Sequence, residues 1–165
     1  MSNAPHITLR EVEPADLDTF FVQSLDAEAI RLAAFTNDTR KDRAVFNAHW
    51  EKILKSPENT NRTIVADGQV AGHISCYPNE GNPEATYWLG REFWGRGIAT
   101  EALKQLLHLI VQRPVTARVA TDNHGSLRVL QKCGFKIIGS DKGFAQGRGA
   151  ETEEYLLRLD ADSAK

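Results

Sequence analysis

Long apolar segments are missing from this chain. No run approaches the roughly 18 residues that a membrane-spanning helix needs, and the first residues lack the basic and apolar pattern of a secretion signal. Strong net charge is missing too, because the formal charge is only −2 at pH 7. A general polyanion-binding surface needs an excess of positive charge, so nucleic acid is not expected as a main partner.

Cysteine is scarce. The chain has two, Cys76 and Cys133, and both fall within expected strands or helices. We therefore expect reduced, buried thiols rather than a disulfide. The five histidines show no metal-ligand spacing with these cysteines, so no metal is predicted. Together with the lack of a membrane span, this favours the cytoplasm.

The composition that is present is ordinary for a globular protein. The 165 residues are 41% hydrophobic and 25% charged, enough for one domain with a sizeable core. We expect a single domain over residues 1–165, with a structured core from about residue 6 to residue 160. Strand patterns lie before and after a central strand–helix–strand unit. This order predicts an α/β fold in which a mixed sheet carries helices on both faces.

The central unit is the most informative stretch. A strand is expected over residues 85–89, followed by a loop that holds Gly95 and Gly97. A helix then begins, and its apolar residues recur at spacings of three and four, which marks one buried stripe. Those apolar residues are Ile98, Ala99, Ala102, Leu103, Leu106, Leu107 and Ile110.

A glycine loop that leads into a helix is suited to binding an anion. The first amides of a helix lack internal partners and lie at the positive end of its dipole. The amides of residues 94–100 could therefore surround a pyrophosphate, with Arg96 adding positive charge. A Walker A loop and a dinucleotide fingerprint are both excluded, because each requires residues that are absent after Gly97. A tight strand-to-helix turn without a ligand is the alternative.

Two sequence blocks narrow the choice. Residues 93–102 (FWGRGIATEA) are followed by residues 123–135 (NHGSLRVLQKCGF), and residues 9–16 (LREVEPAD) precede both. In this order they resemble the GNAT (GCN5-related) acetyltransferases, and most closely the branch that acetylates ribosomal-protein N-termini and small amines. The resemblance implies the GNAT fold, a mostly antiparallel twisted sheet of about six or seven strands.

The resemblance also implies acetyl-CoA as cosubstrate. The backbone of Trp88 and Leu89 would pair with the pantetheine arm, and an N–H near Leu89 would stabilise the oxyanion. Asn123 would contact the cofactor arm, with a helix-capping role as its alternative. Lys132 could reach a phosphate or simply lie on a solvated helix face. The expected cofactor-binding residues are Trp88, Leu89, Trp94, Gly95, Arg96, Gly97, Ile98, Ala99, Thr100, Asn123 and Ser126.

The proton-transfer residues are less well marked. Many relatives carry a tyrosine acid seven residues after this asparagine, where this chain has Leu130. Ser126 is the substitute that the resemblance suggests, and a helix N-cap is its alternative. The expected base is Glu84, because the family often places a glutamate on that strand. Glu80, His73 and Glu153 are further candidates, and each could instead be an ordinary polar residue.

The sequence thus predicts an N-acetyltransferase that moves an acetyl group from acetyl-CoA to a primary amine. The acceptor would be a protein N-terminus or a small amine, shaped by residues 20–60 and 142–150. A binding module that senses acyl-CoA without turnover is the alternative. A homodimer is expected from relatives. Residues 78–83 and 142–149 are expected to be loops, the second of them mobile.

Overall fold

The computed structural model describes residues 4–35 and 42–161. The strands are β1 (Ile7–Glu11), β2 (Thr60–Ala66), β3 (Gln69–Asn79), β4 (Asn82–Leu89), β5 (Val115–Ala120), β6 (Lys136–Ala145) and β7 (Ala150–Leu159). The helices are α1 (Asp16–Ser24), α2 (Ala27–Ala33), α3 (Arg43–Lys55), α4 (Ile98–Leu109) and α5 (His124–Lys132), with a short 3-10 helix η2 (Arg91–Phe93). The α/β class predicted from the sequence is confirmed.

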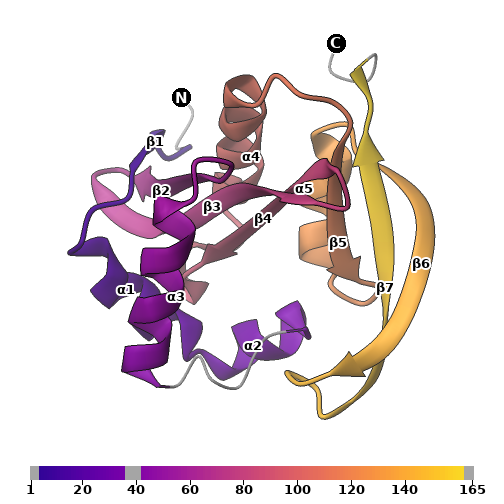
Figure 1. Ribbon diagram of the computed structural model, residues 1–165, viewed down its shortest axis with the longest axis horizontal. Helices are drawn as coiled ribbons and strands as arrows, with labels where there is room; N and C mark the ends of the chain where they lie inside the picture. Colours follow the sequence, from indigo (N-terminus) through magenta and orange to yellow (C-terminus); the bar gives the residue numbers. More distant parts are fainter. Residues whose placement is uncertain (1–3, 36–41, 162–165) are drawn as a thin grey trace.

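The seven strands form one twisted sheet (Figure 1) in the order β1-β2-β3-β4-β5-β7-β6. Neighbouring strands are antiparallel except for β4 and β5, which are parallel. A mostly antiparallel sheet of this size is the arrangement expected for a GNAT fold. The chain reaches β5 through α4 and then completes the sheet with the β6–β7 hairpin.

Helices cover both faces of the sheet. In Figure 1, α1 and α3 lie in front, and α4 and α5 lie behind. The predicted stripe of α4 is buried from Ile98 to Leu107 and packs against β1 and β3. Each large aliphatic side chain buried in this way stabilises the fold by about 1.5–3 kcal/mol. The front face has an aromatic cluster instead, built from Phe20, Phe46 and Trp50.

A buried carboxylate ties α1 to the sheet. The Asp16 side chain is 4% exposed and accepts hydrogen bonds from both terminal nitrogens of Arg10, at 2.7 and 2.9 Å. The Thr63 hydroxyl and the Glu13 N–H also donate to it. Burial alone would raise the pKa of Asp16, but these hydrogen bonds outweigh it and lower the pKa to about 2.

The segment at residues 78–83 is not the predicted loop. β3 and β4 remain paired until a tight turn at Glu80 and Gly81, both of which have positive φ. Pro78 lies opposite Pro83 near the end of this ladder, where a missing N–H costs little. The prolines therefore mark the end of the hairpin rather than a break in the strands.

The predicted mobile loop at residues 142–149 is also mostly strand. β6 pairs with β7 as far as Ala145 opposite Ala150, and Gly143 lies opposite Thr152 within the ladder. Only the turn between Ala145 and Ala150 is unpaired. The glycines suggested a loop, but pairing with β7 supplies the backbone hydrogen bonds that hold this segment extended.

No helix within residues 4–35 and 42–161 is long and apolar enough to cross a membrane. Both cysteines are free thiols, Cys76 buried and Cys133 half-buried. Burial raises the pKa of Cys76 to about 11, so this thiol stays protonated at neutral pH.

Candidate functional site

The site begins where two parallel strands separate. In the described part of the chain, β4 and β5 share one registered pair, Glu84 opposite Thr116. Both strands then continue to their carboxyl ends at Leu89 and Ala120. In sheets of this kind, ligands bind beyond the carboxyl ends of strands that diverge. The open edge of β4 also offers backbone groups that an extended ligand can pair with.

A cavity of about 740 Å³ occupies the opening between the two strands. Residues of α2, β4, β5, α5 and the start of α4 line it, together with the loop before α4. Of the residues predicted to bind the cofactor, only Arg96 lies outside the lining. The predicted residues that line the cavity are Trp88, Leu89, Trp94, Gly95, Gly97, Ile98, Ala99, Thr100, Asn123 and Ser126.

The glycine loop has the geometry of an anion cradle. Gly95 and Gly97 have φ of 72° and 76°, and a Cβ on either would meet no atom within 4 Å. Gly97 is the N-cap of α4, and no side chain of the described residues caps that helix. The first amides of α4 are therefore left to a ligand in the cavity.

Two tryptophans hold the loop in place. The Trp94 indole N–H donates to the Leu89 carbonyl at 3.1 Å, and the Trp88 indole N–H donates to the Gln23 carbonyl at 3.1 Å. Arg91 pairs with Asp26 through Nε at 2.9 Å and Nη2 at 2.5 Å. These bonds fix the strand end and the loop against α1 and α2.

The junction between β5 and α5 is closed by a side chain. Asn123 is the N-cap of α5: its Oδ1 accepts from the Ser126 N–H at 3.3 Å, and its Nδ2 donates to the Leu32 carbonyl at 3.2 Å. The capping alternative for Asn123 is therefore observed, while its side chain still lines the cavity. Ser126 is not the N-cap, so that alternative for Ser126 is wrong.

Tyr87 is a cavity residue that the sequence analysis missed. Its hydroxyl donates to Ser126 Oγ at 2.9 Å and so joins β4 to α5 across the cavity. Burial raises the pKa of Tyr87 to about 12, so the phenol keeps its proton at neutral pH. The period of two along β4 places Tyr87 on the same face as Leu89, a signal that could have identified it. Leu130, at the position of the usual family tyrosine, is buried in the cavity wall.

The four candidate bases do not line this cavity. Among the described residues that line it there is no Glu84, Glu80, His73 or Glu153. Glu84 is 7% exposed, and its carboxylate is enclosed by hydrogen-bond donors. The His73 ring packs against Phe20 and Trp50, at 4.8 Å between ring centroids in each case. The role of Glu84 as base stays a prediction.

Basic side chains favour an anionic ligand. Arg128 and Lys132 of α5 line the cavity, and Lys132 is also exposed, so both of its predicted roles remain open. Arg96 stands outside the lining, with its guanidinium carbon 5.8 Å from the centre of the Phe93 ring. Within residues 4–35 and 42–161, no group of three or more His, Cys, Asp or Glu side chains could hold a metal ion.

The side of the cavity away from α4 is formed by α2, whose end contacts the β6–β7 hairpin. Leu32, Ala33 and Phe35 contribute to the lining. The Gly147 N–H donates to the Ala34 carbonyl at 2.7 Å. Of the two segments expected to shape the acceptor pocket, residues 20–60 contribute to this wall, whereas the described residues of 142–150 contact α2 without lining the cavity.

Comparison with protein families identifies the family of this chain. The model of the acetyltransferase (GNAT) domain matches residues 6–136 of this chain. The chain belongs to the GNAT acetyltransferase family. The relative named uncharacterized N-acetyltransferase p20, from Bacillus licheniformis, is 25% identical over 164 residues, which cover 93% of this chain and 92% of the relative.

Solved structures share the GNAT architecture. The spermidine N-acetyltransferase from Vibrio cholerae, solved with CoA and spermine, has a TM-score of 0.84 at 14% identity and covers 96% of this chain and 97% of its own. The ribosomal-protein-S5-alanine acetyltransferase from Vibrio fischeri has a TM-score of 0.78 at 17% identity, with coverage of 97% and 96%. At these identities the likeness concerns the fold.

Membership of the family makes this chain an acetyl-CoA-dependent N-acetyltransferase. The site fits that cosubstrate. The glycine cradle and the first amides of α4 suit its diphosphate, the basic residues of α5 suit its negative charge, and the open edge of β4 suits its extended pantetheine arm.

Proposed function

We propose that this GNAT acetyltransferase transfers the acetyl group directly from acetyl-CoA to a primary amine while both substrates are bound. The acceptor is a small amine or a protein N-terminus. The observation that carries the proposal is the cavity itself, which runs from the anion cradle of the loop to the wall formed by α2. One continuous space can hold a donor and an acceptor next to each other, as direct attack requires.

In this reaction the amine nitrogen attacks the thioester carbonyl, the carbon–sulfur bond breaks, and the sulfur leaves with the bonding electrons. The loop amides hold the diphosphate. A backbone N–H near Leu89 stabilises the charge that develops on the carbonyl oxygen. The attacking nitrogen loses its extra proton to solvent, and Ser126 donates its hydroxyl proton to the leaving thiolate so that coenzyme A departs as a thiol. Solvent then returns a proton to Ser126, whose oxygen accepts a hydrogen bond from the Tyr87 hydroxyl at 2.9 Å. A thiol has an ordinary pKa near 8.5, so protonation of the thiolate assists the reaction without being obligatory.

The decisive experiment measures thiol release from acetyl-CoA with a panel of amines. Spermidine and peptides with free N-termini test the two acceptor classes, and the same peptides with acetylated N-termini are matched controls. We expect release above background with at least one free amine and none with its blocked form. If the protein bound acetyl-CoA but released no thiol with any amine, the result would contradict turnover and favour the acyl-CoA-sensing alternative.

The order of binding is tested by initial rates measured over both substrate concentrations. Direct transfer predicts intersecting double-reciprocal lines. Parallel lines would indicate a covalent acetyl-enzyme and would contradict the direct-attack mechanism, while leaving the acetyltransferase activity itself intact.

A further inference from the structure

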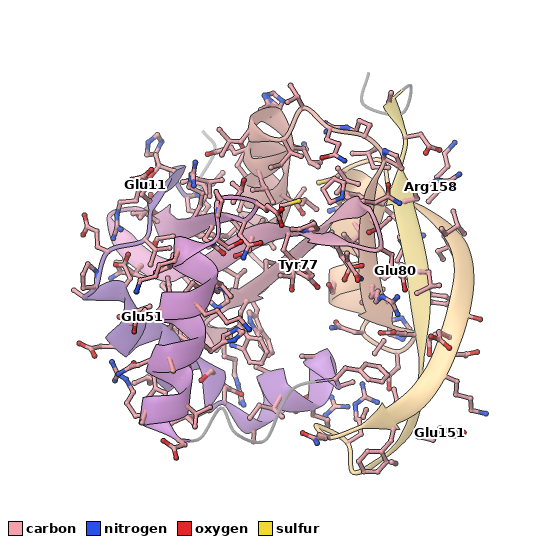
Figure 2. The ribbon with its side chains drawn as sticks, in the orientation of Figure 1. Glu11, Glu51, Tyr77, Glu80, Glu151 and Arg158 are labelled. Carbon is pink, nitrogen blue, oxygen red and sulfur yellow. The ribbon has the colours of Figure 1, made fainter. Side chains whose placement is uncertain are left out.

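The point at which β4 and β5 separate is held by a cluster of charged and polar side chains, which we name the vertex cluster. Its members are Tyr77, Asn79, Glu84, Thr116, Arg118, Asp141 and Glu154. They come from every strand between β3 and β6 in the sheet order. Figure 2 labels Tyr77 near the middle of the molecule.

Glu84 is the centre of this cluster. Its carboxylate is buried, at 7% exposure, and accepts from the Tyr77 hydroxyl at 2.8 Å and from Asn79 Nδ2 at 3.0 Å. On the other side, the Thr116 hydroxyl of β5 donates to it at 3.3 Å. Both of its oxygens are thus occupied by neutral donors from the two sides of the strand separation.

Arg118 extends the cluster into the second half of the sheet. Its Nε lies 3.7 Å from Glu84, and its Nη1 lies 3.0 Å from Glu154 of β7 and 3.9 Å from Asp141 of β6. The hydrogen bond to Glu154, followed by the charges of Glu84 and Glu154, raises the pKa of Arg118. Arg118 also lines the cavity, so the cluster ends at the site.

The vertex cluster lies where side chains can set the relative direction of β4 and β5. Glu84 and Thr116 are the only registered pair between β4 and β5 in the described residues. The cavity walls start immediately beyond that pair, at Ala85 on β4 and Ala117 on β5. With so little backbone pairing, the relative direction of the two strands depends on side chains.

We propose that Glu84 and Arg118 are positioning residues that set the separation of β4 and β5, and with it the width of the acetyl-CoA site. This inference rests on the proposed use of the cavity by acetyl-CoA. It gives Glu84 a role different from the predicted general base. Glu84 acts through the strands whose directions it fixes, whereas a base would have to reach the acceptor amine.

The test compares Glu84→Gln, Arg118→Met and the double variant with the wild-type protein. Calorimetry gives the affinity for acetyl-CoA, and steady-state rates give kcat and KM from pH 6 to pH 9. Glu51→Gln on α3 and Arg62→Met on β2 are matched controls, since both residues lie outside the cluster and the cavity. Figure 2 shows Glu51 far from Tyr77.

Positioning predicts that each single variant weakens acetyl-CoA binding by about tenfold, the size of coupling expected within one network. The double variant should lose little more than either single variant, because both changes release the same constraint. Any decrease of the rate toward pH 6 that the wild-type protein shows should also be seen in Glu84→Gln, because Glu84 is not the group whose protonation causes it. Neither control should change affinity.

A milder variant guards against a failure to fold. Thr116→Val keeps the shape of the side chain but removes one donor to Glu84, and it should weaken acetyl-CoA binding by about two- to threefold. Unchanged affinity in all the cluster variants would overturn the proposal.

A different result would favour general-base catalysis. In that case kcat would fall by about a hundredfold or more in Glu84→Gln alone, while the affinity for acetyl-CoA stayed unchanged. The decrease of the rate toward pH 6 would also disappear in this variant. That result would also overturn positioning. Failure of the wild-type protein to bind acetyl-CoA would instead contradict the proposed use of the cavity.

Discussion

The β4–α4 junction and the β5–α5 junction face the same cavity, and both lead from the carboxyl end of a strand into a helix. At the first, Gly97 caps α4 without a side chain, and the amides of the first turn are left to the cavity. At the second, the Asn123 side chain caps α5 and is bonded in turn to α2. The same topology therefore provides an open amide cradle in one place and a closed, rigid helix start in the other.

Under the proposed function, this difference separates two tasks. An anion is best held by backbone donors that nothing else occupies, so the first junction uses glycine. A side chain that takes part in proton transfer must be held in one orientation. The second junction accordingly fixes Ser126, whose N–H binds Asn123 and whose hydroxyl binds Tyr87. Substitutions at the first junction should change binding, and substitutions at the second should change stability or kcat.

The largest effect is expected from Gly97→Asp. Asp tolerates the left-handed conformation of Gly97 better than most residues, and its carboxylate would stand where the diphosphate binds. Repulsion between like charges costs several kcal/mol, so affinity for acetyl-CoA measured by calorimetry should fall by about a hundredfold or more. Gly97→Asn, which is neutral, should lose less.

Gly68→Asp is the control for this prediction. Gly68 has φ of 81°, and its Cβ position is equally open, but it lies in the turn between β2 and β3. The Gly68→Asp variant should retain the wild-type affinity for acetyl-CoA. Unchanged affinity in folded Gly97→Asp would contradict the anion cradle.

The next effect concerns Asp16, which lies outside both junctions. Its loss of stabilisation at low pH sets the lowest pH at which variants of the two junctions can be compared in the folded state. Its pKa is lowered from 3.8 to about 2 in the folded protein. The corresponding stabilisation, about 2 kcal/mol, is fully present above pH 3.8 and is lost as the pH falls through about 2. Urea unfolding at several pH values should show this loss. Asp16→Asn should remove this part of the pH dependence, whereas Asp18→Asn at an exposed site of the same helix should not.

A smaller loss of stability is expected when the second junction is opened. Asn123→Ala removes the cap of α5 and the bond to Leu32, so the free energy of unfolding should fall by about 1–2 kcal/mol in urea denaturation. Asn123→Asp keeps the capping oxygen but loses the N–H donor to Leu32. Its free energy of unfolding should lie between those of the wild-type protein and Asn123→Ala. Equal stability of all three proteins would show that the two junctions do not differ as described.

The smallest effect is expected on turnover. Ser126→Ala should lower kcat by about tenfold, at the low end for acid–base catalysis because a thiolate leaves readily, with little change in affinity for acetyl-CoA. Tyr87→Phe should show a similar or smaller decrease. Tyr155→Phe, on β7 outside the cavity lining, is the control in the same assay. Wild-type kcat in Ser126→Ala would remove Ser126 from the mechanism.

Local patterns predicted the elements that depend on short-range chemistry. The stripe of α4, the glycine loop and the order of strands and helices could all be inferred, because the spacing of apolar residues and the positions of glycines are properties of neighbouring residues. The continuation of β3 and β4 to the turn at Glu80, and of β6 to Ala145, was missed. Their proline and glycine content indicated loops, and only pairing with a distant strand holds these segments extended.

The site shows the same division. The sequence by itself determined that residues 93–102 form a loop and a helix start, and it predicted a diphosphate there, since those donors belong to consecutive residues. Only the tertiary structure decided which side chains from separate strands meet: Tyr87 beside Ser126, and Glu84 among donors from β3 and β5. Such contacts depend on strand register and direction, which are set by the packing of the whole sheet and leave no local signal in the chain.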